Sequence, residues 1–316
     1  METRNLGRSG LRVSVVGLGC NNFGGRLDVD ATRRVVHRAL DAGITLLDTA
    51  NTYGNRGGSE SQLGEVLGER RKDVVLATKF GMPMDDDGKL QGASRRYVMS
   101  AVEDSLRRLK TDWIDLYQLH QPDPRAPTEE TLRALDDLVH QGKVRYIGCS
   151  NLAGWQVADS IWTSRHHGLT PYVSAQNEYS LLVREPERDL FPALDAYGVG
   201  FLPYFPLAGG LLSGKYERNA PLPAGSRLTD TKRSADRFLT ERNWSIVGAL
   251  QAFCNERGRS LLELAFSWLA SQLLVSSVIA GATKPEQIDA NIGAVNWRLS
   301  DDERTSIDDI TRSPAV

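Results

Sequence analysis

The chain has 316 residues, and its 38 Lys and Arg nearly balance its 40 Asp and Glu, for a formal net charge of −2. The 41% hydrophobic and 25% charged residues are typical of a globular rather than a disordered chain. Near-neutral charge without a long basic run argues against a nucleic-acid or anionic-membrane surface. No apolar run approaches the roughly 18 residues of a membrane helix. The polar N-terminus also lacks a signal-peptide core, so we expect a soluble, cytoplasmic chain with neither nucleic acid nor membrane as partner.

The three cysteines, Cys20, Cys149 and Cys254, lie far apart in the sequence. A disulfide framework and a CxxC motif are therefore both missing, which fits a reducing compartment. The sequence also contains no HExxH, no clustered His and Cys, and no GxSxG. We expect no metal site and no acyl-enzyme chemistry.

Short apolar runs of strand length alternate with helix-like stretches along the chain. The runs fall at residues 13–18, 44–47, 74–77, 114–119, 144–148, 173–176, 199–203 and 275–279. An amphipathic stretch at 30–42 stops at Gly43, and another at 128–139 ends before Gly142. Two sequences of the capping-box type predict further helices: Ser59-x-x-Gln62 before residues 63–67, and Ser260-x-x-Glu263 before residues 261–273.

Eight strand–helix alternations in about 300 residues are typical of a (β/α)8 TIM barrel, an α/β fold. We expect one such domain over residues 1–316. A doubly wound sheet is the alternative, because alternation alone does not show that the sheet closes. Residues 6–10 indicate the turn of a short N-terminal hairpin that caps one end. The Gly/Pro-rich, basic stretch 206–239 indicates a long functional loop after the seventh strand, at the C-terminal face.

In a barrel, functional side chains sit just past the carboxyl ends of the strands. Polar residues follow the predicted strands at these points: Asp48 and Tyr53, Lys79, His120, Ser150 and Asn151, Gln176 and Asn177, and Tyr204. A single strand-end Asp, Lys or His is most often solvated or structural. The convergence of Asp, Tyr, Lys and His at one mouth predicts a proton-transfer site instead.

Two glycine-rich segments imitate nucleotide-binding motifs. Residues 17–24 have the spacing GxGxxxxG rather than GxGxxG, and no helix opens inside them, which argues against a Rossmann site. Residues 209–215 match GxxxxGK, but Tyr216 replaces the Ser or Thr that would bind Mg²⁺. We expect no ATPase, while Lys215 and nearby amides remain candidates to hold a phosphate.

Eight motifs, in order and at barrel spacing, carry a family resemblance over nearly the whole chain. They are GLG (17–19), DTANTYG (48–54), ATKFG (77–81), DLYQLHQPD (115–123), GCSN (148–151), QNEYS (176–180), YFPLAGGLLSGKY (204–216) and GATKPEQIDAN (281–291). With them the chain resembles the aldo-keto reductases, including the branch of the potassium-channel β-subunits. The resemblance implies a barrel that binds NADP(H) across its C-terminal mouth without a Rossmann domain. It also implies a catalytic tetrad of Asp48, Tyr53, Lys79 and His120.

The resemblance further implies contacts along the cofactor. Ser150, Asn151 and Gln176 would hold the nicotinamide carboxamide, and Tyr204 would stack on the nicotinamide ring. The segment 206–215 would fold over the pyrophosphate, and residues after the eighth strand would meet the adenosine end. The full set of implied cofactor residues is Gly19, Ser150, Asn151, Gln176, Tyr204, Pro206, Leu207, Lys215, Arg227, Thr283, Lys284, Gln287 and Asn291.

A preference for NADPH over NADH would rest on Thr283, Lys284 and Arg227 meeting a 2′-phosphate, with Lys284 at the start of a predicted helix. The chain departs from the family pattern at Phe205, because a Ser usually follows the stacking aromatic in this branch. One pyrophosphate contact would then be lost or replaced by backbone.

Carbonyl reduction moves a hydride to carbon and a proton to oxygen, so it needs an acid beside the nicotinamide. The pKa of free Tyr is about 10, too high for easy proton exchange near neutrality. A nearby Lys79 ammonium favours the tyrosinate, and Asp48 keeps Lys79 charged. We expect Tyr53 to act as general acid, tuned by Lys79 and Asp48, with His120 hydrogen-bonding the substrate carbonyl.

The expected function is NADPH-dependent reduction of aldehydes or ketones to alcohols, with a small carbonyl compound as partner. Loops with Asn21, Phe23 and Trp155 would line the substrate pocket, although Trp155 could equally pack on its own helix. The alternative is an NADP(H)-binding redox sensor that turns over slowly and regulates a partner protein. A phosphate-binding barrel with unrelated sugar chemistry fits the fold but not Tyr53 and His120. An oligomer is compatible with the sequence but not indicated by it.

Overall fold

The structure is a computed structural model that describes residues 1–312. Within them, eight parallel strands form one sheet in the order β10-β3-β4-β5-β6-β7-β8-β9, and two more strands form a separate hairpin. The strands of the sheet are β3 (Val16–Gly19), β4 (Leu46–Asp48), β5 (Val75–Phe80), β6 (Ile114–Leu119), β7 (Val144–Ser150), β8 (Ser174–Gln176), β9 (Gly200–Phe201) and β10 (Val278–Gly281). From β3 to β9, strands that follow one another in the chain are neighbours in the sheet, as successive βα units require.

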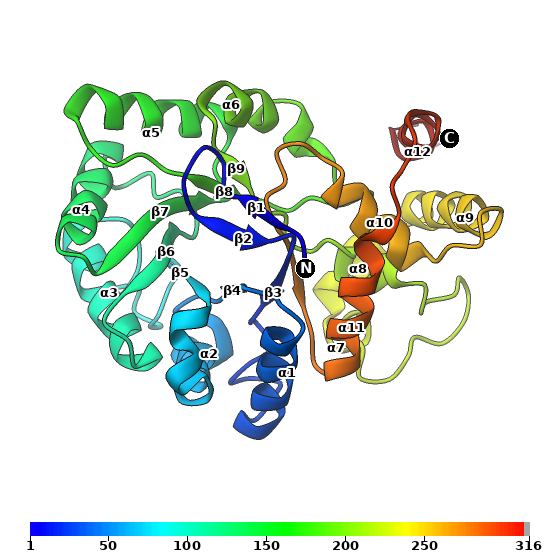
Figure 1. Cartoon of the computed structure of the whole chain (residues 1–316), viewed down its shortest axis with the longest axis horizontal. Coiled ribbons are helices and arrows are strands. Elements are labelled where there is room, and N and C mark those ends of the chain that lie inside the picture. The colour runs from blue at the N-terminus through cyan, green and yellow to red at the C-terminus, as the bar shows by residue number, and fades with distance from the viewer. Residues whose placement is uncertain (313–316) are drawn as a thin grey trace.

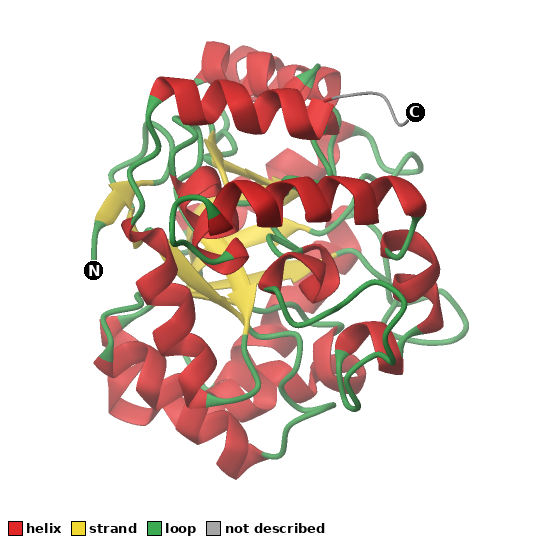
Figure 2. Ribbon diagram, turned by 90° about the vertical axis from the view of Figure 1, so that its right-hand side faces the viewer, coloured by secondary structure: helices red, strands yellow, loops and turns green. Residues whose placement is uncertain are grey.

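The sheet closes on itself between β9 and β10. The amide of Phe201 donates to the Leu274 carbonyl at 2.8 Å, and the amide of Ser276 donates to the Phe201 carbonyl at 2.9 Å. The amide of Ile279 donates to the Pro203 carbonyl at 3.1 Å. Figure 2 shows the strands inside a layer of helices. The (β/α)8 prediction is confirmed, and the doubly wound alternative, which keeps two open edges, is excluded.

Helices lie around the outside of the barrel (Figure 1). They are α1 (Val29–Asp41), α2 (Tyr53–Leu67), α3 (Arg95–Leu109), α4 (Thr128–His140), α5 (Gly154–His167), α6 (Leu190–Tyr197), α7 (Arg227–Asp230), α8 (Lys232–Phe238), α9 (Glu241–Asn255), α10 (Leu261–Ala270), α11 (Pro285–Gly293) and α12 (Asp301–Arg312), with 3₁₀ turns η1 (Gly68–Asp73), η2 (Glu185–Glu187), η3 (Ala208–Ser213) and η4 (Ala294–Asn296). In α1, Asp28 accepts from the Ala31 amide as N-cap, and Val35 and Val36 are buried. The helices expected at residues 30–42 and 128–139 are confirmed to within one residue.

The capping box at Ser260 is confirmed, whereas the one at Ser59 is wrong. Ser260 and Glu263 exchange both expected hydrogen bonds at the start of α10. Ser59 lies inside α2, where its hydroxyl donates to the Cys20 carbonyl at 2.8 Å. Gln62 Oε1 accepts from a backbone amide of the loop after β3 at 2.7 Å. Contacts with that loop therefore occupy the polar groups that a helix cap would need.

The expected N-terminal hairpin is confirmed, since β1 (Thr3–Asn5) pairs antiparallel with β2 (Arg12–Ser14). Its turn covers the amino-terminal end of the barrel, where Leu6 is buried in one cluster with Leu46. Gly7 has φ +58°, and a Cβ there would lie 2.5 Å from a backbone nitrogen of β9, so only glycine fits. The hairpin crosses that end of the barrel (Figure 1), which leaves the carboxyl-terminal end for ligands.

Residues 206–239 are more ordered than the long loop that the sequence indicates, because they contain η3, α7 and α8. Leu228 of α7 and Phe238 of α8 are buried. Gly209 in η3 has φ +70°, and a Cβ there would lie 2.8 Å from Leu228 Cδ2. The short helical turns thus pack on one another and give this segment a small core of its own.

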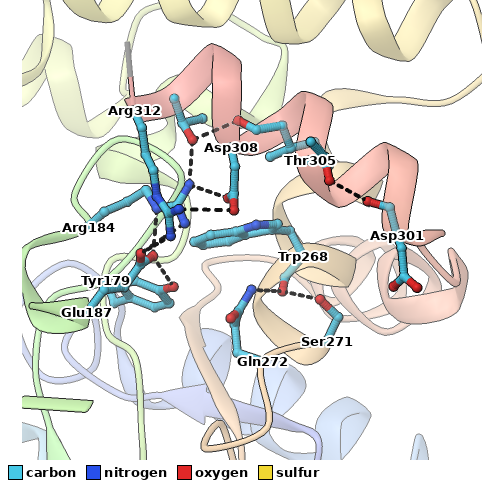
Figure 3. A network of polar contacts seen from close by, with 12 residues as sticks. Tyr179, Arg184, Glu187, Trp268, Ser271, Gln272, Asp301, Thr305, Asp308 and Arg312 are labelled. Atoms are coloured by element: carbon cyan, nitrogen blue, oxygen red, sulfur yellow. Dashed lines mark hydrogen bonds and ion pairs between the residues drawn. The ribbon is translucent and has the colours of Figure 1, made fainter. Parts of the chain in front are cut away.

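A polar network fixes α12 to the outer layer of the barrel (Figure 3). The Arg184 guanidinium donates to Glu187 at 2.6 Å and to Asp308 at 2.7 Å, and it lies 5.0 Å from the centre of the Trp268 ring. Arg312 also donates to Glu187, at 2.8 Å. Carboxylates from η2 and α12 therefore share two arginines, which ties the last turn of α12 to η2.

Candidate active site

The four residues expected to be catalytic meet at the carboxyl-terminal end of the barrel. Asp48 ends β4, Lys79 lies in β5, His120 follows β6, and Tyr53 begins α2. The Lys79 ammonium donates to Asp48 Oδ2 at 2.6 Å and to the Tyr53 hydroxyl oxygen at 3.4 Å. The rings of Tyr53 and His120 meet edge to face, with centroids 5.6 Å apart. Lys79 is fully buried and Asp48 is 3% exposed, so water screens this ion pair little.

A left-handed turn follows Tyr53 directly. Residues 54–57 all have positive φ, and two of them, Asn55 and Arg56, are not glycine. A left-handed conformation costs about 1–2 kcal/mol for each non-glycine residue. A Cβ on Gly54 would lie 2.3 Å from a backbone carbonyl oxygen of the loop after β3. Close backbone packing at Gly54 therefore holds the strained turn, and with it the start of α2.

Two buried glutamines also bind Asp48. Gln118 and Gln176 donate from Nε2 to Asp48 Oδ1, at 3.1 Å and 2.9 Å. The resemblance pointed to Gln176, but the sequence analysis missed Gln118. A signal was present: Gln118 lies two residues after Leu116 in β6, so both side chains face the barrel interior, where a polar group needs a partner.

Burial and charge together set the protonation of Lys79 and Tyr53. Burial alone would lower the pKa of Lys79, but Asp48 and the Tyr53 oxygen raise it overall, so Lys79 is an ammonium. Burial raises the pKa of Tyr53, and the charge of Lys79 offsets only part of that rise. Desolvation of the Tyr53 hydroxyl therefore outweighs the charge of Lys79, which was expected to favour the tyrosinate. Tyr53 keeps its proton at neutral pH.

His120 is uncharged at neutral pH. Burial, and then the charge of Lys79, lower the pKa of its imidazole to about 3. Its backbone carbonyl accepts from Asn151 Nδ2 at 2.9 Å, whereas its buried Nδ1 has no hydrogen-bond partner within residues 1–312. The neutral ring can donate one hydrogen bond, but it is not a source of protons at neutral pH.

Residues at the ends of β7 and β8 and just after β7 and β9 form a hydrogen-bonded group beside His120. Ser150 Oγ donates to the Gln176 carbonyl at 2.7 Å, and the Tyr204 hydroxyl donates to Asn151 Oδ1 at 2.8 Å. Asn151 has φ +62°, a conformation that asparagine tolerates better than most residues. The structure thus brings together the four residues expected at the nicotinamide. Their contact with a cofactor stays a prediction.

The residues expected at the pyrophosphate lie in the segment after β9. Pro206 is buried, Leu207 is half-buried and Lys215 is exposed. The half-buried Arg227 lies at the start of α7, with its guanidinium 5.2 Å from the centre of the Phe205 ring. Neither Lys215 nor Arg227 forms an ion pair within residues 1–312. Burial lowers the pKa of Arg227, which marks a cation that lacks a counterion.

The residues expected at the adenosine end lie on α11 or just before it: Thr283, Lys284, Gln287 and Asn291. The Thr283 amide donates to Gln287 Oε1 at 2.7 Å, and Asn291 is 6% exposed. Lys284 is the exposed N-cap residue of α11 and has no ion pair in the described chain. Gly19 pairs with Gly281 in the barrel, so β3 reaches the same rim.

The residues expected in the substrate pocket do not share one surface. Phe23 is fully buried in the main core, so its side chain offers no surface to a ligand. Trp155, in the first turn of α5, is 70% exposed, so its own helix does not bury it. Asn21 is half-buried at the rim near Gly281. A role in substrate binding stays a prediction for Asn21 and Trp155.

Other chemistries find little support at this site. Burial raises the pKa of Cys149 and of Cys254 to about 12, so both thiols are protonated and poorly reactive. Among residues 1–312, no three or more His, Cys, Asp or Glu side chains are grouped so that they could hold a metal ion. No helix in that range combines the length and apolar character of a bilayer-spanning segment.

The profile of the aldo/keto reductase family matches residues 15–312. The chain belongs to the aldo/keto reductase family. It is 38% identical to the uncharacterized oxidoreductase YrpG of Bacillus subtilis, over 99% of this chain and 97% of the relative. It is 37% identical to a probable voltage-gated potassium channel subunit beta of Oryza sativa subsp. japonica, over 94% of this chain and 92% of the relative. It is 33% identical to L-glyceraldehyde 3-phosphate reductase of Escherichia coli K12, over 94% and 88%.

These comparisons confirm the resemblance to the family and to its channel-subunit branch. Two of the three relatives carry the names of an oxidoreductase and a reductase, and the family performs carbonyl reduction. This aldo/keto reductase is accordingly an oxidoreductase whose tetrad residues meet at the open end of its barrel.

Proposed function

We propose that this aldo/keto reductase uses NADPH to reduce aldehydes or ketones to alcohols, with Tyr53 as the proton donor. The observation that carries the proposal is the buried chain of Asp48, Lys79 and Tyr53, joined by contacts of 2.6 Å and 3.4 Å. A protonated phenol beside a buried ammonium is suited to give up its proton as negative charge grows on a bound carbonyl oxygen.

The residues around the mouth fit a phosphorylated dinucleotide. Ser150, Asn151 and Gln176 carry the donors and acceptors that a carboxamide needs. Arg227 is a half-buried guanidinium without a carboxylate partner in residues 1–312, which suits phosphate oxygens. Lys284 adds a positive charge at the N-terminus of α11, where helix amides favour anions. When bound, NADPH supplies the hydride that adds to the carbonyl carbon.

The chain's own residues handle the proton. Tyr53 donates its hydroxyl proton to the carbonyl oxygen, and Lys79, kept cationic by Asp48, stabilises the tyrosinate that remains. The neutral His120 donates a hydrogen bond to the same oxygen and orients it. Because burial raises the pKa of Tyr53, reduction continues through neutral pH and falls only in the alkaline range. Alcohol oxidation, which needs the tyrosinate, rises there.

Tyr53→Phe tests the proposal, with NADPH absorbance followed against a panel of aromatic and aliphatic aldehydes. We expect turnover to fall about 10²–10⁴-fold, the usual contribution of a general acid, while NADPH affinity is kept. Tyr146→Phe is the matched control, because that hydroxyl forms no hydrogen bond to a tetrad residue. Wild-type turnover in Tyr53→Phe would rule out this proton donor.

A redox-sensing function is the second candidate, because one relative, from rice, is named as a probable voltage-gated potassium channel subunit beta rather than as an enzyme. The two functions differ in turnover, because a sensor binds NADP(H) and a partner protein but reduces carbonyls slowly. Tight NADPH binding without turnover of any aldehyde would move the assignment to the sensor. We place either function in the reducing cytoplasm, since all three cysteines are buried free thiols.

A further inference from the structure

We propose that Gln118 is a positioning residue for carbonyl reduction, because its carboxamide holds both Asp48 and Gln176. It thereby couples two groups: the proton-donor chain, which is Asp48, Lys79 and Tyr53, and the nicotinamide clamp, which is Ser150, Asn151 and Gln176. The inference rests on the proposed function and adds a residue to it. Gln118 lies in the motif DLYQLHQPD (115–123), but the family resemblance implies no role for it. It does not need to touch substrate or cofactor to act.

The geometry links three side chains from three strands. Gln118 from β6 and Gln176 from β8 both donate to Oδ1 of Asp48 at the end of β4, at 3.1 Å and 2.9 Å. Gln176 Nε2 also lies 3.4 Å from Gln118 Oε1 and donates to it. Gln118 is fully buried, and Gln176 and Asp48 are 2% and 3% exposed. The contacts cross the barrel interior, so each glutamine constrains the other.

The orientation of both amides follows from the charge of Asp48. An ionised carboxylate only accepts hydrogen bonds, so both glutamines must present their NH₂ groups to it. The carbonyl oxygen of Gln176 is thereby turned away from Asp48. Gln118 removes the freedom of Gln176 to flip, because the same NH₂ group also faces Gln118 Oε1. A fixed amide at Gln176 is what a carboxamide clamp requires.

Gln118 also affects the proton donor through Asp48. The buried carboxylate accepts from an ammonium on one oxygen and from two neutral amides on the other. Without the Gln118 donor, the carboxylate is less well solvated and draws the proton of Lys79 toward itself. The positive charge beside Tyr53 then weakens, so the pKa of Tyr53 rises further above its ordinary value.

Several titratable groups face this network from the elements around it. Lys79 from β5 and Tyr53 from α2 contact it or its ion pair, and the Cys20 thiol after β3 interacts with Asp48. The charge of Lys79 also acts on His120, which follows β6, and lowers the pKa of its imidazole. Burial raises the pKa of Cys20 well above its ordinary value, and His120 is neutral, so neither titrates across neutral pH.

Gln118→Met is the first test, because methionine keeps the length of the side chain and removes both amide contacts. We expect NADPH affinity to fall about fivefold, measured by quenching of protein fluorescence, since roughly one hydrogen bond of the clamp is weakened. We expect turnover to fall about tenfold and its alkaline limb in alcohol oxidation to move to higher pH. Circular dichroism and thermal melting verify the fold.

Gln118→Glu is the second test and gives a result that a merely structural role would not. While the introduced carboxyl group is protonated, it donates to Asp48 as the amide does, so activity and NADPH affinity are kept at acidic pH. Once it ionises, two carboxylates face each other, and both quantities fall together with one new ionisation above the pKa of about 4.3 of free Glu. Wild type has no such step.

Ser174→Ala is the matched control. Its hydroxyl is buried beside Gln118 in the barrel interior and has no hydrogen-bond partner within residues 1–312, so we expect wild-type profiles. If wild type reduces aldehydes and both Gln118 variants behave like Ser174→Ala, the positioning role is wrong. If Gln118→Met does not fold, the shared ionisation in Gln118→Glu decides. If wild type binds NADPH without turnover, the proposed reductase fails, while the two affinity measurements still decide the role of Gln118.

Discussion

His120 is a buried imidazole next to a buried ammonium, and this placement affects stability as well as the site. The pKa of His120 is lowered to about 3 in the folded chain, whereas an unfolded chain titrates at about 6.5. Between these values the unfolded state binds more protons, so the free energy of unfolding decreases as the pH falls. The folded chain therefore loses stability below about pH 6.5.

We expect His120→Gln to reduce this acid sensitivity. Urea unfolding at about pH 7 and about pH 5 should show a smaller drop in the free energy of unfolding for the variant than for wild type. His166→Gln, which changes an exposed imidazole, is the control and should keep the wild-type drop. An unchanged drop in His120→Gln would mean that His120 does not titrate as its burial requires.

At this scale the sequence predicted which residues meet, but not their electrostatics. Asp48, Lys79 and His120 could be placed because barrel strands end at one rim. The raised pKa of Tyr53 could not, because desolvation depends on every atom around the hydroxyl. Phe23 illustrates the same limit: an aromatic residue in a rim loop can face a ligand or the core, and here it is fully buried.

The left-handed turn after Tyr53 makes the start of α2 sensitive to a single methyl group. We expect Gly54→Ala to lose stability by more than about 2 kcal/mol and to lose turnover, because a Cβ would lie 2.3 Å from a carbonyl oxygen. Gly168→Ala is the control for strain alone, since Gly168 has φ +65° with nothing within 4 Å of its Cβ position. It should cost about 1–2 kcal/mol and keep turnover.

Urea unfolding and aldehyde-dependent NADPH oxidation measure both variants. Equal losses of stability in Gly54→Ala and Gly168→Ala would show that close packing at Gly54 is unimportant.

At the scale of elements, local sequence patterns predicted helices correctly where neighbouring residues determine the structure, as in α1 and α10. They failed at Ser59, whose hydroxyl is occupied by the Cys20 carbonyl, a partner that no local pattern reveals.

The network around Arg184 carries a prediction for the whole molecule. Arg184 is 13% exposed and joins carboxylates from η2 and α12, so Arg184→Met leaves Glu187 and Asp308 with fewer donors. We expect the free energy of unfolding to fall by about 2–3 kcal/mol. Arg133→Met, which removes a solvent-exposed ion pair with Glu129, should lower the free energy of unfolding much less. Similar losses in the two variants, measured by urea unfolding, would contradict a structural role for this network.

Barrel closure is the property of the whole molecule that the sequence left open. Eight alternations of strand and helix fit a closed or an open sheet. Backbone hydrogen bonds between β9 and β10 close the sheet, and these strands are far apart in the chain. The same holds for segment 206–239, whose buried Leu228 and Phe238 lie among Gly, Pro and charged residues typical of a loop. The local periodicity of a sequence predicts neither the pairing of distant strands nor the packing within an inserted segment.

Among the strand neighbours of the barrel, β9 and β10 share the fewest paired residues. β9 meets the segment before β10 through a single isolated bridge, between Phe201 and Val275, whereas β6 and β7 share five residue pairs. Amide protons of Phe201 and Ser276 should therefore exchange with solvent sooner than those of β6. Segment 206–239 begins shortly after β9, so local opening between β9 and β10 would loosen the start of this segment while β4 and β5 stay paired. The hydrogen bond from Lys79 on β5 to Asp48 on β4 would then stay intact while the other side of the barrel opens.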